Sequence, residues 1–269
     1  MSAAHPVECV YSIEGKGPPI FLVHGIGARR VTWSKLVSHL RDRFTCISYD
    51  LRGHGESPGL GKRFGLDELV ADVEALRAKL GIPRISIVGH SLGGMIGPAY
   101  ARAYPSRVDK LGLLSTAAFR TADDSARVMG VVKSMEDTSV PDQLDMLVNR
   151  WFTDEFQKAN PDVIALRKKQ VLDTDQGVFL NVFHIYAETE MSPWLHEVKA
   201  PSLVLTGEMD GGCNPRLNRQ IADALPNSKL VILNGMKHQI LMEAPQLVAA
   251  HLVPFLEGGD RHYLSGQSR

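Results

Sequence analysis

Cysteine, net charge and long hydrophobic runs are all scarce in this sequence. Its 269 residues include three cysteines, Cys9, Cys46 and Cys213, which are too few and too scattered for a disulfide framework or a CxxC metal site. Their odd number is typical of a reducing compartment. Thirty basic residues balance thirty acidic ones, which gives no broad electrostatic reason to bind nucleic acid or an anionic membrane. We therefore expect no nucleic-acid partner, no membrane partner and no metal.

Signals for export, membrane insertion and repetition are also missing. The first ten residues have no basic start followed by an apolar core, so they do not predict a secretory signal. No apolar run approaches the roughly 18–20 residues that span a bilayer, and no repeat is visible at periods of about 20–50 residues. The hydrophobic fraction of 44% and the charged fraction of 22% are ordinary for a globular protein. These features predict a soluble cytoplasmic protein and exclude solenoids and propellers.

Short apolar runs alternate with helical patterns through most of the chain. Each run is apolar on both faces, which indicates the strands of a parallel sheet covered on both sides. The expected strands cover residues 19–23, 44–49, 84–88, 110–114, 202–206 and 230–233, with an antiparallel edge strand at 7–13, and the expected helices cover 66–80, 91–104, 217–225 and 245–256. The pattern predicts an α/β fold with a mostly parallel central sheet and helices on both faces.

Residues 119–194 interrupt this alternation. They contain no good strand run but do contain helix-like segments around 126–135, 142–151, 163–172 and 179–189. We therefore predict one α/β core formed by residues 1–118 and 195–269, with a helical insertion at 119–194. The insertion is rich in methionine and aromatic residues, which favour either an apolar pocket or packing of the insertion onto the core. Met129, Trp151 and Trp194 are the candidate substrate-binding residues within it.

The sharpest chemical signal is Gly89-His90-Ser91-Leu92-Gly93, which matches the G-x-S-x-G pattern. It stands after an apolar strand run and before a helical pattern, where such a segment forms a tight strand-to-helix turn. Glycines flank the serine because side chains there would clash in that turn. The turn exposes the serine hydroxyl above the sheet, at the positive end of a helix. We predict that Ser91 is a nucleophile.

The base that activates Ser91 is expected downstream. A serine hydroxyl is a weak nucleophile on its own, and the partners of this turn follow in the order serine, acid, histidine. His238 follows the last strand run through the loop 234–237, which places it at the sheet edge where Ser91 points. The other downstream histidines lie in or near the insertion, in the last helix or in the tail: His184, His196, His251 and His262. We predict that His238 is the general base.

Two carboxylates follow the strand run at 202–206 and compete as the acid partner of the histidine. Asp210 is followed by Gly211 and Gly212, which allow the loop to turn and aim the carboxylate at the imidazole. Glu208 comes too soon after the strand to reach over the sheet. We predict that Asp210 fixes the tautomer of His238 and stabilises its charged form. A simple turn role for Asp210 is the weaker interpretation.

Two backbone N–H groups are expected to form an oxyanion hole. One comes from Leu92, the residue after the nucleophile, and the other from Ile26 in the loop after the first parallel strand. His24 in the same loop is predicted to be a structural partner rather than a catalyst. Arg29 and Arg30 follow this loop. We expect them to be exposed loop charges rather than residues that bind a substrate carboxylate.

Together these segments resemble the α/β-hydrolase superfamily. The matching segments are 24–27 (HGIG), 50–57 (DLRGHGES), 89–94 (GHSLGG), 207–210 (GEMD) and the histidine at 238 with 243–245 (EAP). The resemblance implies the α/β-hydrolase fold, a mainly structural segment 50–57 that includes His54, and a helical cap inserted before the last two strands, over the pocket. Haloalkane dehalogenases and epoxide hydrolases of this superfamily carry an aspartate in place of Ser91, which argues against both. Residues 91–97 (SLGGMIG) are similar to the corresponding segment of enol-lactonases.

The activity that the resemblance implies is hydrolysis of a carboxylic ester, a lactone or a related small acyl substrate. It would proceed through an acyl-enzyme on the serine, without metal or cofactor. C–C bond hydrolases of ring-cleavage products and cofactor-free haloperoxidase-like enzymes stay open as alternatives. A ligand-binding, receptor-like member with little turnover is the alternative from another class. The presence of Ser91, Asp210 and His238 together favours an enzyme.

Overall fold

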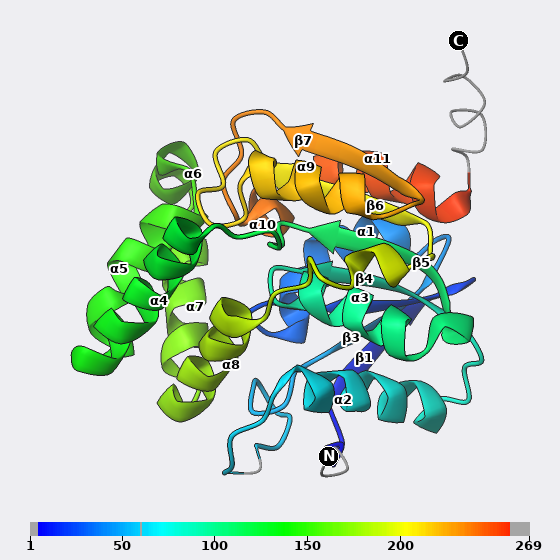
Figure 1. Ribbon diagram of the computed structural model, residues 1–269, viewed down its shortest axis with the longest axis horizontal. Helices are drawn as coiled ribbons and strands as arrows, with labels where there is room; N and C mark the ends of the chain where they lie inside the picture. The colour runs from blue at the N-terminus through cyan, green and yellow to red at the C-terminus, as the bar shows by residue number, and fades with distance from the viewer. Residues whose placement is uncertain (1–4, 60, 259–269) are drawn as a thin grey trace.

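A seven-stranded sheet crosses the middle of the molecule, with the strand order β1-β3-β2-β4-β5-β6-β7 (Figure 1). The computed structural model describes residues 5–59 and 61–258, so the tail histidine His262 lies outside the described residues. β1 runs antiparallel to β3, and the other neighbouring pairs are parallel. The strands are β1 (Tyr11–Gly15), β2 (Pro19–Val23), β3 (Thr45–Tyr49), β4 (Ile85–His90), β5 (Val108–Leu114), β6 (Ser202–Gly207) and β7 (Ser228–Leu233). The predicted α/β fold with a mostly parallel sheet is confirmed.

The central strands bury side chains on both faces of the sheet. Along β2, Ile20 and Leu22 belong to one hydrophobic core, whereas Phe21 and Val23 belong to the other. Successive side chains of a strand point to opposite faces, so a run without polar residues forms a strand that is covered on both sides. β4, β5 and β6 are buried in the same way along most of their length.

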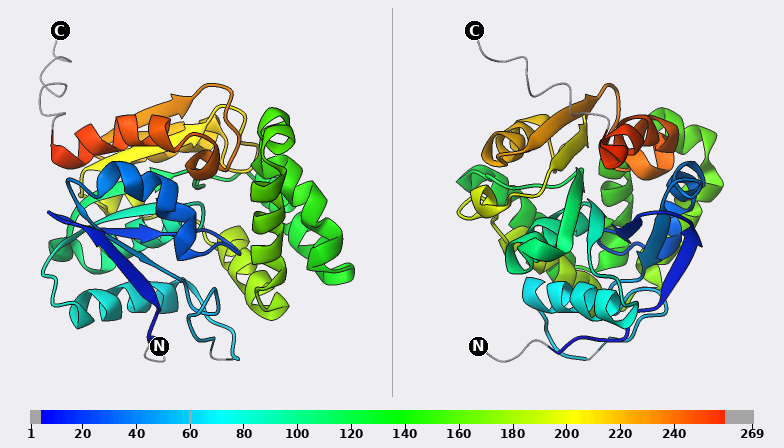
Figure 2. Two further views of the ribbon diagram at one scale, coloured as in Figure 1. Left: turned by 180° about the vertical axis from the view of Figure 1, so that it is seen from behind. Right: turned by 90° about the vertical axis from the view of Figure 1, so that its right-hand side faces the viewer.

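Helices cover both faces of the sheet. α1 (Ser34–Leu40) and α11 (Pro245–Glu257) pack against each other on one face, and α2 (Leu66–Lys79), α3 (Gly93–Ala103) and α9 (Pro215–Ala224) cover the other (Figure 2). Short elements complete the described chain: η1 (Arg30–Trp33), η2 (Pro105–Arg107), η3 (Leu195–Glu197) and α10 (Ile240–Glu243). Among the helices of residues 5–59 and 61–258, none combines the length and the apolar character needed to cross a membrane.

The helices between β5 and β6, which we call the insertion helices, lie beyond the carboxyl ends of the strands (Figures 1 and 2). They are α4 (Ala122–Asp137), α5 (Val140–Trp151), α6 (Asp154–Ala159), α7 (Pro161–Leu172) and α8 (Gln176–Glu188). The side chains of Thr121, Ser139, Thr153 and Asp175 each accept a hydrogen bond from a backbone N–H of the first turn that follows. These caps satisfy donors that a helix start leaves free, and they explain where four of the insertion helices begin.

Several predicted boundaries differ from the structure by a few residues, and two of the differences have a clear structural cause. The edge strand covers residues 11–15 rather than 7–13, because the N–H of Val7 donates to Asp72 Oδ1 (2.8 Å) on α2 instead of to a neighbouring strand. The helix expected from Ser91 begins at Gly93, because Ser91 adopts a left-handed backbone conformation. The short helices α1 and α6 had no counterpart in the sequence prediction.

Candidate active site

Ser91 occupies a sharp turn between β4 and α3. Its φ of 56° lies in the left-handed region, which residues other than glycine rarely adopt. The Ser91 N–H donates to the Leu114 carbonyl (2.9 Å), and Thr116 Oγ1 donates to the Ser91 carbonyl (2.9 Å). A Cβ at Gly89 would lie 2.0 Å from the Gly93 carbonyl oxygen, so close backbone approach requires the first glycine of the pattern. The main chain therefore fixes the serine at the carboxyl end of β4.

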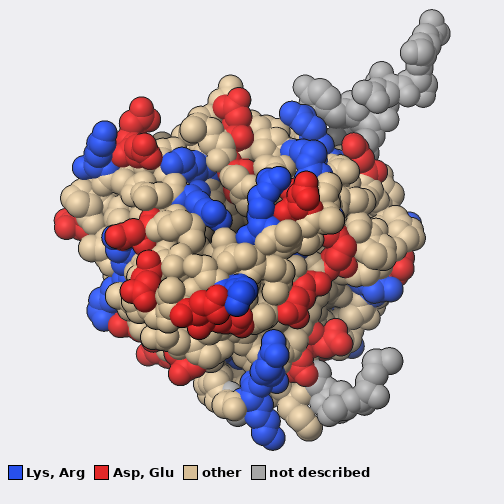
Figure 3. Space-filling model, turned by 60° about the vertical axis from the view of Figure 1, so that its left-hand side comes forward, with Lys and Arg blue, Asp and Glu red and all other residues tan. Residues whose placement is uncertain are grey.

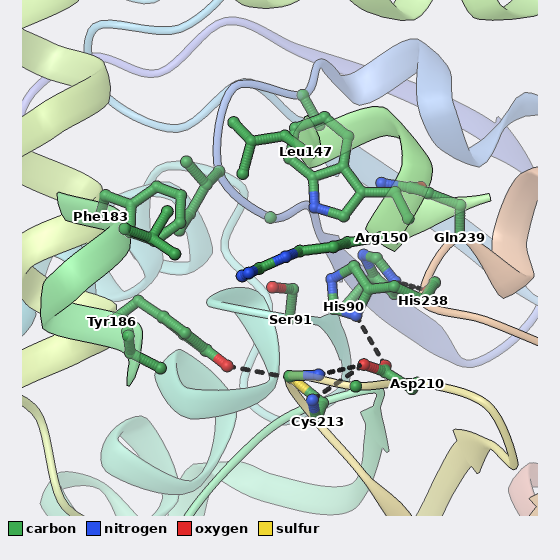
Figure 4. A pocket seen from close by; sticks show the side chains of 18 of the residues that line it. His90, Ser91, Leu147, Arg150, Phe183, Tyr186, Asp210, Cys213, His238 and Gln239 are labelled. Atoms are coloured by element: carbon green, nitrogen blue, oxygen red, sulfur yellow. Dashed lines mark hydrogen bonds and ion pairs between the residues drawn. The ribbon is translucent and has the colours of Figure 1, made fainter. Parts of the chain in front are cut away.

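Asp210 and His238 form a hydrogen-bonded pair in the same pocket as Ser91 (Figure 4). Asp210 follows β6, and its Oδ1 accepts from the N–H groups of Gly212 (3.1 Å) and Cys213 (2.8 Å). Its Oδ2 lies 2.7 Å from Nδ1 of His238, which follows β7. The ends of β4, β6 and β7 thus bring together three side chains that are far apart in the sequence.

The pKa values of Asp210 and His238 shift in opposite directions. Burial raises the pKa of Asp210, but the attraction of His238 and the N–H groups of the loop outweigh burial and hold this pKa below its usual value. Burial lowers the pKa of His238, but the neighbouring Asp210 carboxylate outweighs it and raises this pKa above its ordinary value of 6.5. The pair therefore stabilises a charged imidazole. Because Nδ1 is bonded to Asp210, Nε2 is the ring nitrogen that can exchange a proton with another group.

Glu208, the alternative acid, lies in a different setting. Its side chain is exposed, and its Oε2 accepts from the N–H of Gly235 (3.0 Å) in the loop after β7. Asp210 is only 3% exposed. The loop after β6 therefore directs Asp210, and not Glu208, to His238.

The other described histidines downstream of Ser91 do not line the pocket. His184 lies 2.8 Å from both Glu136 and Glu188 within the insertion helices. His196 is exposed in η3, and His251 lies within α11. Of the downstream histidines in the described residues, His238 is the one brought to Ser91.

His90 is a residue of this site that sequence reasoning missed. Its Nε2 donates to the backbone carbonyl of His238 at 2.9 Å, and the two rings lie 4.8 Å apart. Burial lowers the pKa of His90 to about 3, so the ring is neutral near pH 7. The His90 ring holds the backbone of His238. In the sequence, the position of His90 next to Ser91 was the one signal that could have pointed to this role.

The loop after β2 passes directly against Ser91. A Cβ at Gly25 would lie 2.9 Å from the Cβ of Ser91. The N–H groups of Ile26 and Leu92 donate to no protein acceptor in the part of the chain that the structure describes. The Gly25 carbonyl belongs to the same planar peptide group as the Ile26 N–H and accepts from Nδ1 of His24 at 2.8 Å. This bond fixes the direction of the Ile26 N–H, which is left available as a donor beside Ser91.

His24 and His54 are buried supports of the same loop. The N–H of Leu51 donates to Nε2 of His24 (3.0 Å), which places the ring proton on Nδ1. The N–H of Gly27 donates to Nε2 of His54 (3.1 Å), whose Nδ1 donates to the Arg52 carbonyl (3.1 Å). Burial lowers the pKa of both imidazoles to about 3, so both are neutral hydrogen-bonding groups near pH 7.

Arg29 and Arg30 are engaged within the protein. Arg30 forms ion pairs with Asp50 and Glu56. Arg29 donates to Oγ1 of Thr174 (2.9 Å), which follows α7. Both arginines are partly buried, which corrects the expectation of exposed loop charges, and neither lines the pocket.

The pocket above Ser91 has a volume of about 450 Å³. Its apolar wall is formed by Ile26, Val128, Val131, Leu147, Trp151, Phe183 and Leu241. Trp151 therefore lies where a substrate-binding residue is expected. Met129 instead packs against the hydrophobic core, and Trp194 lies near the far end of α3, with its ring 5.2 Å from the Arg102 guanidinium. The structure corrects the placement of Met129 and Trp194 in the pocket.

The insertion helices contact both loops that surround Ser91. The N–H of Gln239 donates to the Trp151 carbonyl (2.9 Å), which attaches the loop of His238 to the end of α5. Arg167 of α7 donates to the carbonyls of Ile26 (2.9 Å) and Gly27 (2.5 Å). Sequence reasoning missed Arg167, because a single basic residue in a helical segment is typical of a solvated surface.

Asp210, Cys213 and His238 also form a group of potential metal ligands. Their carboxylate, thiol and imidazole donor atoms lie within 4.8 Å of one another. The hydrogen bond between Asp210 and His238 already joins two of these three side chains. The arrangement therefore fits an acid–base pair better than a metal centre.

Comparison with known proteins agrees with this geometry. A family model described as the alpha/beta hydrolase fold matches residues 18–245. The chain belongs to the α/β-hydrolase fold family. The match runs from the strand before the Ile26 loop to the segment after His238, so it spans every residue of the site described above.

The relatives of this α/β-hydrolase include enzymes with similar coverage of both chains. The (E)-2-((N-methylformamido)methylene)succinate hydrolase of Acinetobacter baylyi is 22% identical over 251 residues, 92% of this chain and 93% of that protein. The 3-oxoadipate enol-lactonase 2 of Acinetobacter baylyi is 24% identical over 245 residues, 90% of this chain and 91% of that protein. The crystal structure of the enol-lactonase from Burkholderia xenovorans superposes with a TM-score of 0.86 at 26% identity, over 93% of this chain and 97% of that chain. The predicted resemblance to enol-lactonase-like α/β-hydrolases is confirmed.

Proposed function

We propose that this α/β-hydrolase is a serine hydrolase that cleaves a carboxylic ester or a lactone through an acyl-enzyme. The observation that carries the proposal is the presence in one pocket of Ser91, with its φ of 56°, and the Asp210–His238 pair, with its 2.7 Å bond. A hydroxyl, an imidazole and a carboxylate in this relation supply a nucleophile, a general base and a group that orients the base.

In the first half of the reaction, Ser91 Oγ attacks the carbonyl carbon of the substrate while its proton moves to Nε2 of His238. The carbonyl oxygen becomes an oxyanion and accepts hydrogen bonds from the N–H groups of Ile26 and Leu92. Asp210 stabilises the imidazolium that forms. His238 then gives its proton to the leaving alkoxide oxygen, the C–O bond breaks, and the acyl group remains on Ser91.

In the second half, a water molecule loses a proton to His238 and attacks the acyl carbon. The same two N–H groups stabilise the second oxyanion. Collapse of this intermediate returns the proton from His238 to Ser91 Oγ and releases a carboxylic acid. A lactone gives a hydroxy acid, because its acyl and alkoxide parts belong to one molecule.

The division of the chain into a core, residues 1–118 and 195–269, and a helical cap, residues 119–194, is also part of the proposal. It is supported by the origin of the pocket wall, since Val131, Leu147 and Trp151 come from the insertion helices while Ser91 and His238 follow strands. A cytoplasmic location is proposed on the basis of three scattered, free cysteines.

The choice of an ester or lactone is supported by the names of the relatives, of which two are enol-lactonases and one is a hydrolase of a substituted methylenesuccinate. Hydrolysis of a C–C bond and a haloperoxidase-like reaction remain alternatives, because both fit a reactive serine in the same turn. A receptor-like protein would bind a ligand without turnover.

A panel of substrates tests the proposal. We expect hydrolysis of 4-nitrophenyl esters and of lactones, and little or no cleavage of a ring-cleavage product that carries a vinylogous diketone. Ser91→Ala removes the activity, whereas Ser106→Ala, a change of an exposed serine, keeps it. Turnover that survives in Ser91→Ala contradicts the mechanism, and faster cleavage of the C–C substrate than of any ester or lactone contradicts the proposed substrate class.

A further inference from the structure

Four arginines line the pocket, and none of them is paired with a carboxylate in the described residues. They are Arg120, Arg127, Arg150 and Arg167. Two carboxylates also line the pocket, but Asp210 is bonded to His238 and Asp124 is paired with Arg216. The wall of the pocket therefore carries an excess of positive charge.

Arg167 is a buried cation that has no acidic partner among residues 5–59 and 61–258. Its side chain is among the largest that are fully buried, and its guanidinium lies 4.7 Å from the centre of the Trp151 ring. Two of its nitrogens donate to the carbonyls of Ile26 and Gly27, and its Nε has no acceptor. Burial lowers its pKa to about 9, so the group is still charged at neutral pH. A buried charge of this kind is stabilised by an anion that binds nearby.

Arg120 is a second arginine with free donors. Its Nη1 donates to the Thr189 carbonyl (3.1 Å), and its guanidinium lies 4.5 Å from the centre of the Tyr186 ring. Its Nε and Nη2 are buried in the pocket wall without an acceptor. An Nε–H and an Nη–H on one edge of a guanidinium match the two oxygens of a carboxylate.

Arg150 belongs to α5 and is exposed, and its guanidinium points into the pocket in the close-up view (Figure 4). Arg127 of α4 is exposed as well. The face that carries the insertion helices shows several basic side chains around a hollow (Figure 3). An anionic ligand that enters this pocket passes exposed arginines before it reaches the buried ones.

Two of the arginines lie by loops on opposite sides of the strand that carries Ser91. Ser91 follows β4, which lies between β2 and β5 in the sheet. Arg167 binds the loop after β2, and Arg120 lies in the segment after β5. A substrate whose scissile carbonyl lies at Ser91 therefore has positive charge within reach on either side.

We propose that the substrate is an acyl compound that carries a carboxylate besides its scissile carbonyl. Arg150 and Arg120 bind the carboxylate, and the buried charge of Arg167 adds to the attraction. This inference rests on the proposed function, because it places the scissile carbonyl at Ser91. The Nε/Nη2 edge of Arg120 can bind two oxygens of a carboxylate or of a phosphate, so the binding measurement below compares the two anions directly.

A pair of matched esters tests the inference. Mono(4-nitrophenyl) adipate and 4-nitrophenyl hexanoate have acyl chains of the same length and differ in a terminal carboxylate or methyl group. We expect the wild type to prefer the adipate ester, and Arg150→Met and Arg120→Met each to lower kcat/KM for that ester by about 10–100-fold. The ratio of kcat/KM for the adipate ester to kcat/KM for the hexanoate ester therefore falls in both variants. The control is Arg43→Met, an exposed arginine paired with Glu257, which leaves the ratio of the two esters unchanged.

Arg167 is left intact in this test, because it also holds the carbonyls of the Ile26 loop. A wild type that hydrolyses both esters equally overturns the inference. A ratio that does not change in Arg150→Met and Arg120→Met overturns it as well.

A binding measurement separates the inference from the proposed catalytic role of Ser91. Calorimetric titration of Ser91→Ala with adipate, adipamide and inorganic phosphate needs no turnover. We expect adipate to bind at least tenfold more tightly than adipamide or phosphate, and to lose this advantage when Arg150→Met is added. Equal binding of adipate and adipamide, or binding of phosphate alone, contradicts the inference. Adipate binding without any Ser91-dependent hydrolysis supports the carboxylate-binding site and contradicts the proposed function, and with it the placement of a scissile carbonyl at Ser91.

Discussion

The strand ends and the insertion helices contribute different groups to one pocket. Ser91, Asp210 and His238 follow β4, β6 and β7, whereas Trp151 and Arg150 come from α5. The serine, aspartate and histidine can carry out a reaction. The tryptophan and the arginine determine the shape and the charge of the pocket around them.

The two regions also differ in how they hold their residues. The Ser91 N–H donates to the Leu114 carbonyl, and the Cys213 N–H donates to the Asp210 carboxylate, so backbone groups determine these positions. The pocket side of the insertion helices depends on side-chain packing, such as the guanidinium of Arg167 over the ring of Trp151. Substitutions at the strand ends should therefore affect the chemistry, whereas substitutions in the insertion helices should affect the choice of substrate.

The largest expected effect within this comparison is the loss of the acid at the end of β6. Asp210→Asn is expected to fold normally and to lower kcat by up to about 10⁴-fold, because the wrong tautomer of His238 then faces the serine. Glu208→Gln is the matched control and keeps most of the activity, because Glu208 bonds Gly235 and not the histidine. Steady-state kinetics with circular dichroism of both variants decides this. If Glu208→Gln lost the activity and Asp210→Asn kept it, the assignment of Asp210 as the acid partner of His238 would be wrong.

The pH profile gives the next largest effect. His238 must be neutral to accept the serine proton, and Asp210 raises its pKa above 6.5, so kcat/KM should rise with pH and reach half its maximum above pH 6.5. Each pH unit below that midpoint lowers kcat/KM by about tenfold. In Asp210→Asn the residual activity should show a lower midpoint. A wild-type midpoint below 6.5 would show that the carboxylate does not stabilise the charged imidazole.

A substitution in the apolar wall of the pocket should change the choice of substrate and leave the reactivity of Ser91 unchanged. Trp151→Ala is expected to raise KM by about tenfold for longer acyl chains and to shift the chain-length preference, because it removes apolar surface from the pocket. Labelling of Ser91 by a fluorophosphonate should remain. Trp194→Ala is the control, since Trp194 packs near Arg102 and away from the pocket. If Trp151→Ala lost labelling to the same extent as turnover, Trp151 would affect the chemistry at Ser91 and not substrate choice alone.

The smallest effect is expected within the insertion helices. Hydrogen bonding to Glu136 outweighs burial and, together with Glu188, raises the pKa of His184. The charged form of His184 therefore stabilises the fold below about pH 6.5. This contribution disappears as the pH rises through the higher pKa of the folded state. His184→Gln should therefore lower the free energy of unfolding by at most about 1 kcal/mol at pH 6 and by less at pH 9. Urea denaturation at both pH values measures this, with kcat as the control. A greater loss of stability at pH 9 than at pH 6 would contradict the role of the charged form.

Much of the sheet could be predicted because its signals are local. An apolar run such as 19–23 and the turn after it identify a strand and its carboxyl end without knowledge of its neighbours. The same reasoning pointed to Ser91, Asp210 and His238, since each follows such a run. The break in this alternation predicted the insertion at residues 119–194, and the family resemblance added that it would be a helical cap over the pocket.

The wall of the pocket could not be predicted in the same way. Met129 and Trp151 both lie on predicted helical segments, and spacing alone does not show which of them faces the pocket and which faces the core. Arg120 and Arg167 resemble surface residues in the sequence, because the aromatic rings that cover them are far away along the chain or come from another helix. The short helices α1 and α6 lack the length over which helical periodicity is visible.

Labelling with a fluorophosphonate, followed by intact mass and peptide mapping, tests the central claim most directly. The account predicts a single adduct on the peptide that contains Ser91, no adduct in Ser91→Ala, a strongly slowed reaction in His238→Ala and an unchanged reaction in Ser106→Ala. An adduct on another residue, or labelling that persists in Ser91→Ala, would contradict the claim that this pocket contains a nucleophilic serine.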